Sequence, residues 1–128
     1  MADTVSTNTD ADGSRRKIIQ LLNFSDGTGE SAVVKVDASA DADADYYSIQ
    51  EIKYDIGGFT SVDLEFDATT NTKIVEMPTG TGYYNLSING GRVDPLATVY
   101  TGDIVLTTLG AAADATYDIT ISLIKKKL

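Results

Sequence analysis

Alternating apolar and polar residues near the end of the chain predict β-strands. Residues 116–126 (TYDITISLIKK) place Tyr117, Ile119, Ile121 and Leu123 on one face and polar residues on most of the other. A period of two is expected when one face of a strand packs on a core. Residues 101–108 (TGDIVLTT) predict a preceding strand, joined to the last one by the loop 109–115. We therefore expect the chain to close with a hairpin whose final strand lies inside a sheet.

Shorter segments earlier in the chain give the same signal between Gly-rich turns. With the two strands of the final hairpin included, the predicted strands cover residues 18–24, 32–37, 47–54, 61–67, 72–77, 83–88, 101–108 and 116–126. Residues 61–67 (SVDLEFD) alternate strictly and form a hairpin with 72–77. Between Ile49 and Ile52 the alternation breaks, which indicates a bulge or a helical turn.

Strands at this spacing predict one antiparallel β-sandwich over residues 14–128. About eight strands without a convincing long helix make the chain all-β. An eight-stranded jelly roll is the nearest named architecture, and an immunoglobulin-like sandwich is the alternative. Residues 1–13 are polar, with Val5 the only sizeable apolar residue after Met1. They cannot bury enough surface to order alone, so we expect an extended N-terminal arm.

Composition excludes several classes of function. The 128 residues include no cysteine and no histidine, which removes thiolate catalysis, cysteine metal sites and the commonest general base. A net charge of -9 opposes binding to nucleic acid. No apolar run approaches the roughly 18 residues of a membrane span. Asp63, Glu65 and Asp67 share one side of one strand and so do not face each other across a cleft. We therefore expect no enzymatic activity.

The few basic residues form two clusters that are candidate contacts with a partner protein. One lies at the start of the first predicted strand and the other after the last. If these strands are neighbours, the clusters form one basic spot on an acidic body. Strand ends that blunt a sheet edge are the alternative interpretation. The candidate residues are Arg15, Arg16, Lys17, Lys125, Lys126 and Lys127.

Carboxylates at mostly alternate positions in VDASADADAD make a weak calcium candidate, because calcium prefers oxygen ligands. Neither Gly at the sixth position nor Glu at the twelfth is present, so the segment is not an EF-hand, and a solvated acidic loop is the alternative. No other metal or cofactor is expected. The candidate calcium ligands are Asp37, Asp41, Asp43 and Asp45.

Two pairs of adjacent tyrosines could contact a ligand or a partner. In an extended strand one member of each pair faces inward and the other outward. Outward tyrosines stack on sugars or anchor protein interfaces, and they also cover core edges. The candidates are Tyr46, Tyr47, Tyr83 and Tyr84.

The predicted C-terminal hairpin resembles those of small virion structural proteins of marine tailed bacteriophages. Those hairpins often contain T-G-D-I, a loop of Gly, Ala and Asp, then Y-x-I/L-x-I/L and a terminal basic residue; here TGDI is followed by YDITISLIKK. The resemblance implies a capsid decoration or cement protein that binds the outside of the assembled head and stabilises it.

The same resemblance implies partners and a location. The partners are the major capsid protein and neighbouring copies of the chain, which form a homo-oligomer on the particle. The expected location is the capsid surface of the virion, after synthesis in the host cytoplasm. The alternative function is a carbohydrate-binding or host-contacting module of a head fibre or tail, with the outward tyrosines as its platform.

Overall fold

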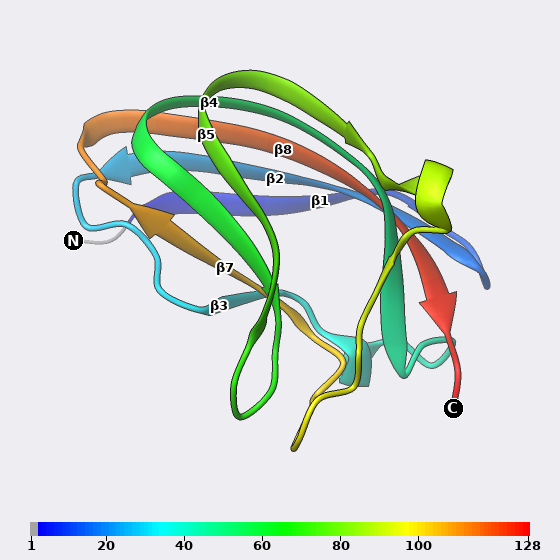
Figure 1. Cartoon of the computed structure of the whole chain (residues 1–128). Helices are drawn as coiled ribbons and strands as arrows, with labels where there is room; N and C mark the ends of the chain where they lie inside the picture. The colour runs from blue at the N-terminus through cyan, green and yellow to red at the C-terminus, as the bar shows by residue number, and fades with distance from the viewer. Residues whose placement is uncertain (1–2) are drawn as a thin grey trace.

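Antiparallel strands make up most of the chain in a computed structural model that describes residues 3–128, except the side chains of residues 10, 11 and 89 (Figure 1). The elements are β1 (Thr4–Asp12), β2 (Arg16–Asp26), β3 (Val33–Val36), η1 (Ala38–Ala40), β4 (Tyr46–Phe66), β5 (Thr72–Asn85), η2 (Leu86–Asn89), β6 (Arg92–Val93), β7 (Ile104–Leu109) and β8 (Ala113–Lys126). Within the described range, no helix is long and apolar enough to cross a membrane. The prediction of an all-β antiparallel sandwich with about eight strands is confirmed.

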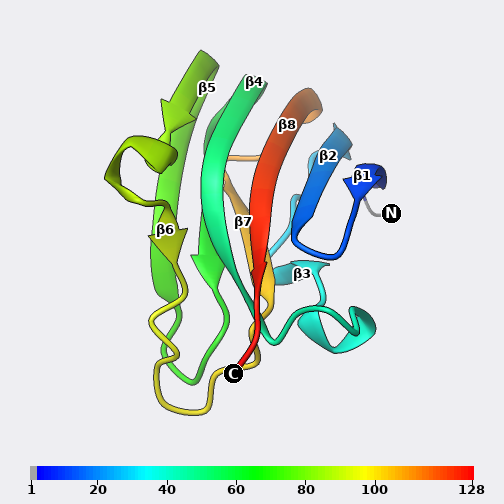
Figure 2. The same cartoon turned by 90° about the vertical axis from the view of Figure 1, so that its right-hand side faces the viewer.

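A single hydrogen-bonded sheet folds over on itself to make the sandwich. The strand order is β1-β2-β8-β4-β7-β3, and β5 and β6 also pair with β4. The first part of β4 pairs with β8 and its last part with β7. A wide layer of β1, β2, β8 and the adjoining parts of β4 and β5 therefore arches over a narrow layer that contains β3 and β7 (Figures 1 and 2). This order departs from the two Greek keys of a jelly roll, because β4 and β5 run through both layers.

The bend of β4 depends on glycine. Gly58 has φ +84, a conformation that other residues rarely adopt, and a Cβ there would lie 2.8 Å from the Cβ of Ala115. The predicted strands 47–54 and 61–67 are therefore two parts of one bent strand. Likewise, β5 joins the predicted strands 72–77 and 83–88, with Gly80 at φ +120. Both predicted interruptions were wrong, because these glycines bend the hairpin without ending it.

The core lies between the two layers and is apolar on both sides. From β8, Ala115, Tyr117, Ile119, Ile121 and Leu123 are buried, whereas Thr116 and Asp118 are exposed, so the predicted alternation is confirmed. The narrow layer meets them with Val62, Leu64, Phe66, Ile104 and Leu106. The register of β4 against β8 shifts between Ile49 and Glu51, which confirms a bulge at the predicted break.

The N-terminal segment is part of the sheet. Residues 4–12 form the edge strand β1, which pairs with β2 from Thr4–Phe24 to Asp12–Lys17. The prediction of a separate arm is wrong for this segment, while residues 1 and 2 lie outside the described range. The polar residues of β1 bury little apolar surface. An edge strand nevertheless satisfies backbone hydrogen bonds on one side without forming a core of its own.

Candidate functional site

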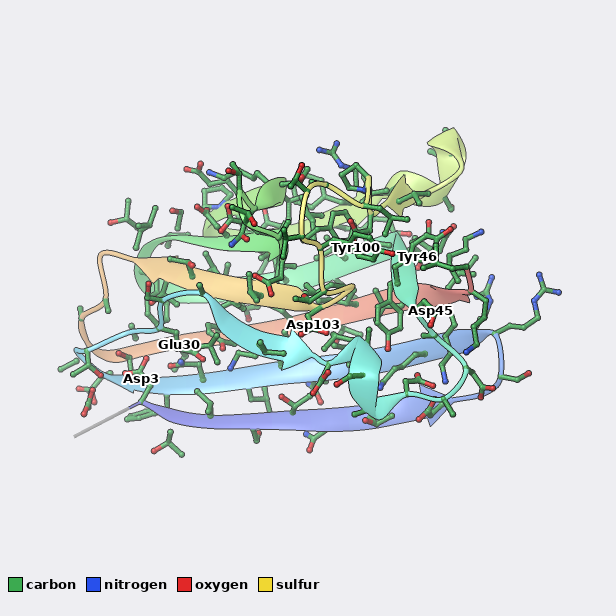
Figure 3. The ribbon with its side chains drawn as sticks, turned by 90° about the horizontal axis from the view of Figure 1, so that it is seen from below. Asp3, Glu30, Asp45, Tyr46, Tyr100 and Asp103 are labelled. Carbon is green, nitrogen blue, oxygen red and sulfur yellow. The ribbon has the colours of Figure 1, made fainter. Side chains whose placement is uncertain are left out.

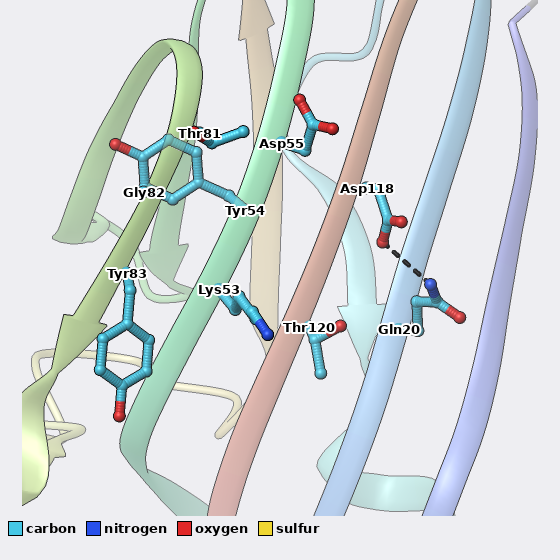
Figure 4. A pocket seen from close by; sticks show the side chains of 9 residues that line it. All are labelled: Gln20, Lys53, Tyr54, Asp55, Thr81, Gly82, Tyr83, Asp118 and Thr120. Carbon is cyan, nitrogen blue, oxygen red and sulfur yellow. Dashed lines mark hydrogen bonds between the residues drawn. The ribbon is translucent and has the colours of Figure 1, made fainter.

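A shallow groove crosses the outer face of the wide layer. Four facing residues on neighbouring strands form one row: Tyr83 of β5 pairs with Lys53 of β4, Lys53 with Thr120 of β8, and Thr120 with Gln20 of β2. A second row contains Thr81, Asp55 and Asp118. Paired residues share one face of a sheet, and Ile52 and Ile119, which adjoin Lys53 and Thr120 in the chain, are buried, so both rows point outward. These side chains line a hollow of about 570 Å³. Figure 4 shows how they lie around it.

The hollow continues toward the start of β2. A neighbouring hollow shares Lys53, Tyr83 and Thr120 with the first. Its further lining residues are Arg16, Ile18, Gln50, Glu51, Ser87 and Ser122. We refer to the two connected hollows as the outer groove. The outer groove crosses neighbouring strands of the wide layer, and the hydrogen-bonded backbone of these strands holds its lining residues in place.

The outer groove combines one aromatic ring with closely spaced polar groups. The aromatic residue is Tyr83, which is 57% exposed. Desolvation raises the pKa of its hydroxyl, and the neighbouring Glu51 carboxylate adds to this effect. Gln20 Nε2 donates a hydrogen bond to Asp118 Oδ1 at 2.9 Å, which fixes two planar side chains beside each other. The groove therefore offers hydrogen-bond donors and acceptors next to an exposed ring.

The four candidate tyrosines have different environments. Tyr83 lies in the outer groove, whereas Tyr84 is half-buried and stacks on Tyr54 with ring centroids 5.8 Å apart. Tyr47 is fully buried, and its hydroxyl donates to Asp41 Oδ2 at 3.4 Å. Tyr46 is half-buried at the start of β4 (Figure 3). The four do not form one platform, because β4 separates the pairs along its length.

The two basic clusters lie side by side, because β2 pairs with β8. Arg16 is opposite Ile124, and the backbone amide of Lys125 donates to the carbonyl of Arg15 at 2.7 Å. Arg15 and Arg16 are exposed and flank a small hollow beside Ile124. Among the described side chains, no carboxylate forms an ion pair with Arg15, Arg16 or Lys126. We call these three residues the basic end.

The other candidate lysines are engaged within the domain. The ammonium of Lys125 lies 2.8 Å from Asp41 Oδ2 and 2.5 Å from Asp12 Oδ1, and its side chain is 2% exposed. Lys17 is 4.0 Å from the same Asp41 oxygen, and Lys127 is 3.9 Å from Asp45. The interpretation of Lys125 as a surface contact is therefore wrong. Its position on the inward face of β8 required a charged partner, which the acidic loop supplies.

The acidic loop is organised by the protein's own groups. Asp37 caps η1 by accepting a hydrogen bond from the Ser39 amide at 3.0 Å. Asp41 binds Lys125, and Asp45 Oδ2 accepts from the backbone amide of Leu128 at 2.8 Å. Among the described residues, no group of three or more acidic side chains is placed to hold a metal ion. The calcium candidate, which also includes Asp43, therefore has no converging ligand set.

A buried polar cluster at the opposite end escaped prediction. Glu30 and Lys35 form an ion pair at 2.5 Å with side chains 6% and 4% exposed. Glu30 also accepts hydrogen bonds from Tyr117 and Asn23. Burial is the main cause of the raised pKa of Tyr117, and the Glu30 carboxylate raises it further. The cluster connects the loop before β3 to the inner face of β2 and β8. The amide of Asn23 and the hydroxyl of Tyr117 donate to carboxylates of the protein itself, which indicates a structural role, although Asn23 Oδ1 has no hydrogen-bond partner.

Asp3 anchors the start of β1 beside this cluster (Figure 3). Its carboxylate accepts hydrogen bonds from the side chains of Asn23 and Ser25 and from the amides of Asp26 and Gly29. Burial alone would raise the pKa of this carboxyl, but the hydrogen bonds outweigh burial and lower the pKa to about 2. The bonds therefore favour the charged carboxylate and hold the first strand on β2.

The fold and the surface define an all-β antiparallel domain with an outer groove and a basic end. No protein-family model matches the chain. No curated protein is significantly similar to it. The function is therefore inferred from the residues and their arrangement.

Proposed function

We propose that this chain is a non-enzymatic structural protein of a bacteriophage virion that decorates and stabilises the outside of the head. Its partners are the major capsid protein and neighbouring copies of the chain, and its location is the capsid surface. The observation that carries the proposal is the juxtaposition of Arg15 and Arg16 with Lys126 on a chain of net charge -9. The resemblance of its C-terminal hairpin to those of small virion proteins indicates the kind of partner.

The basic end suits contact with an acidic protein surface. Arg15 and Arg16 are exposed, and the described acidic side chains leave both unpaired. A guanidinium presents several donors in a planar fork that matches a carboxylate. The remaining acidic surface repels other acidic surfaces, so attachment is favoured in one orientation. Many identical contacts around a shell then add to a large total stabilisation, although each is modest.

Neighbouring copies have a second surface available in the free edge of β1. This strand is the first in the sheet order, with β2 as its partner. Thr4 to Thr9 are exposed and uncharged. Uncharged stretches of an edge strand, such as residues 4–9 of β1, readily pair with a strand from another chain. We therefore assign contacts between copies to β1 and contact with the shell to the basic end.

The test is binding to shells that lack the protein. Purified protein is mixed with such shells, and bound protein is measured after sedimentation over a range of concentrations. We expect the double variant Arg15→Gln/Arg16→Gln to bind about tenfold more weakly, since two exposed ion pairs contribute together about 1.4 kcal/mol. Raising the salt concentration should weaken the wild type more than the variant.

A charge-matched control separates specific contact from overall charge. Ser31→Glu/Thr70→Glu changes the net charge by the same amount at two exposed positions outside the basic end. This variant should bind like the wild type. If the wild type does not bind shells, the proposal fails. If both double variants lose binding equally, the role of the basic end is refuted.

A further inference from the structure

We propose that the outer groove binds a neutral oligosaccharide. This inference goes beyond the decoration role and does not depend on it, because it concerns the outer face of the wide layer. The row Tyr83, Lys53, Thr120 and Gln20 forms the floor of the site. The next row adds Asp55 and Asp118.

The shape suits an extended ligand. Strands in a sheet lie about 4.8 Å apart, so the three steps from β5 to β2 separate Tyr83 from Gln20 by roughly 14 Å. The floor residues come from paired strands and keep fixed spacing. The groove is open along its length, so a chain of several sugar rings can lie across the strands. A preorganised floor reduces the entropy lost on binding.

The lining chemistry matches the two kinds of surface on a sugar ring. The ring of Tyr83 offers an apolar face that remains accessible, with 57% of the residue exposed. Sugar rings carry C–H groups on one face, which pack on aromatic rings. Their hydroxyls both donate and accept hydrogen bonds, and the hydrogen-bonded pair Gln20 and Asp118 presents an amide and a carboxylate side by side. Lys53 and Thr120 add donors between the ring and this pair.

Other ligand classes fit less well. Lipid chains need an extended apolar surface, whereas the large apolar side chains of the lining are limited to Tyr83, Tyr54 and Ile18. Polyanions such as nucleic acids require an excess of basic residues. Against the two cations Lys53 and Arg16, however, the groove contains the three carboxylates Asp55, Asp118 and Glu51. The net negative lining therefore favours an uncharged glycan over an acidic one.

Neighbouring glycine and aromatic residues hold the Tyr83 side of the groove in place. The ring of Tyr54 covers Gly82, where a Cβ would lie 2.3 Å from the Tyr54 hydroxyl oxygen. Tyr54 also stacks on Tyr84. These contacts on the inner side fix the residues that flank Tyr83, so its ring is presented from a rigid strand.

The experiment uses the purified full chain and needs no shells. A glycan array of neutral oligosaccharides identifies a ligand, and calorimetry measures its affinity. We expect Tyr83→Ala to weaken binding at least tenfold and Tyr83→Phe to retain most of it. Phe24→Ala is the matched control: Phe24 lies on β2 of the wide layer, is 55% exposed, and is outside the groove lining. This variant should bind like the wild type.

Three results would overturn the inference. The first is that the wild type binds no neutral glycan at millimolar concentration. The second is that Phe24→Ala and Tyr83→Ala lose the same amount of glycan affinity, and the third is that Tyr83→Ala binds glycan as tightly as the wild type. Shell binding by Tyr83→Ala is measured in parallel and should be unchanged. The failure of glycan binding is thus distinguishable from the failure of the decoration role.

Discussion

Replacing Lys125 by methionine should destabilise the fold, although a lysine this close to the chain end would ordinarily be assigned to the surface. Its ammonium contacts Asp12 and Asp41, and its side chain is 2% exposed. Methionine keeps most of the aliphatic stem and removes the charge. Asp41 is then left with Lys17 at 4.0 Å, the hydroxyl of Tyr47 at 3.4 Å and the backbone amide of Asp43 at 3.0 Å.

The expected cost follows from the burial of the two carboxylates. Breaking a buried ion pair costs about 3–5 kcal/mol, because the remaining charge is left without compensation. The side chain of Asp41 is 7% exposed and incurs this penalty, whereas that of Asp12 is 48% exposed and is solvated by water. We therefore expect a loss of about 2–3 kcal/mol in the free energy of unfolding. Lys126→Met, the matched control, should change stability by less than about 0.5 kcal/mol.

Urea denaturation at pH 7, followed by circular dichroism, measures both variants against the wild type. Burial alone would raise the pKa of Asp41, but Lys125 and the amide of Asp43 outweigh it, so the pKa is lowered. A lowered pKa contributes stability above the usual value of 3.8 and loses it as the pH falls through the folded-state pKa. The difference between Lys125→Met and the wild type should therefore shrink below about pH 4. Equal midpoints for the two lysine variants at pH 7, or a difference independent of pH, would refute this reasoning.

Three further outcomes are expected. Deleting residues 1–12 should lower the thermal midpoint, because β1 pairs along β2; an unchanged midpoint in circular dichroism would contradict this. Asp3→Asn should reduce stability by about 1 kcal/mol at pH 7, a value lowered for solvent screening. In urea titrations the difference should shrink below about pH 4 and vanish only below about pH 2, the folded-state pKa. Gly58→Ala should lower the free energy of unfolding by about 2–3 kcal/mol in the same titrations, because the new Cβ strains the backbone and meets Ala115. Gly80→Ala should cost less, because its Cβ would enter open space, and equal costs would exclude the contact with Ala115.

Local patterns predicted the interior strands because burial imposes a period of two. The inward residues of β8 follow the sequence pattern through Leu123, and the irregularity after Ile49 is a bulge. Continuity of β4 across Gly58 could not be predicted in the same way. Glycine is compatible with both a loop and a bend, and only the pairing of β4 with β8 before Gly58 and with β7 after it shows which is present.

Of the residues that line the outer groove, Tyr83 and Arg16 were predicted as candidate contacts, whereas Lys53, Thr120 and Gln20 were not. Thr120 was placed on the outer face by alternation, yet its position between Lys53 and Gln20 depends on the register of three strands. Register is set by long-range packing, which a local pattern does not contain. The charge of Lys125 likewise suggested exposure, because its ion pair with Asp41 joins segments far apart in the chain.

The two proposed surfaces meet at Arg16. This residue lines the small hollow beside Arg15 and Ile124, and it also lines the end of the outer groove. A shell protein seated on the basic end therefore covers that end of the groove. Tyr83 also lines the hollow that contains Arg16, but Tyr83 and Thr81 belong to β5, which β4 and β8 separate from β2, so the β5 side of the groove stays accessible. Glycan recognition by a docked copy must consequently depend on the Tyr83 end, since Arg16 is engaged by the shell.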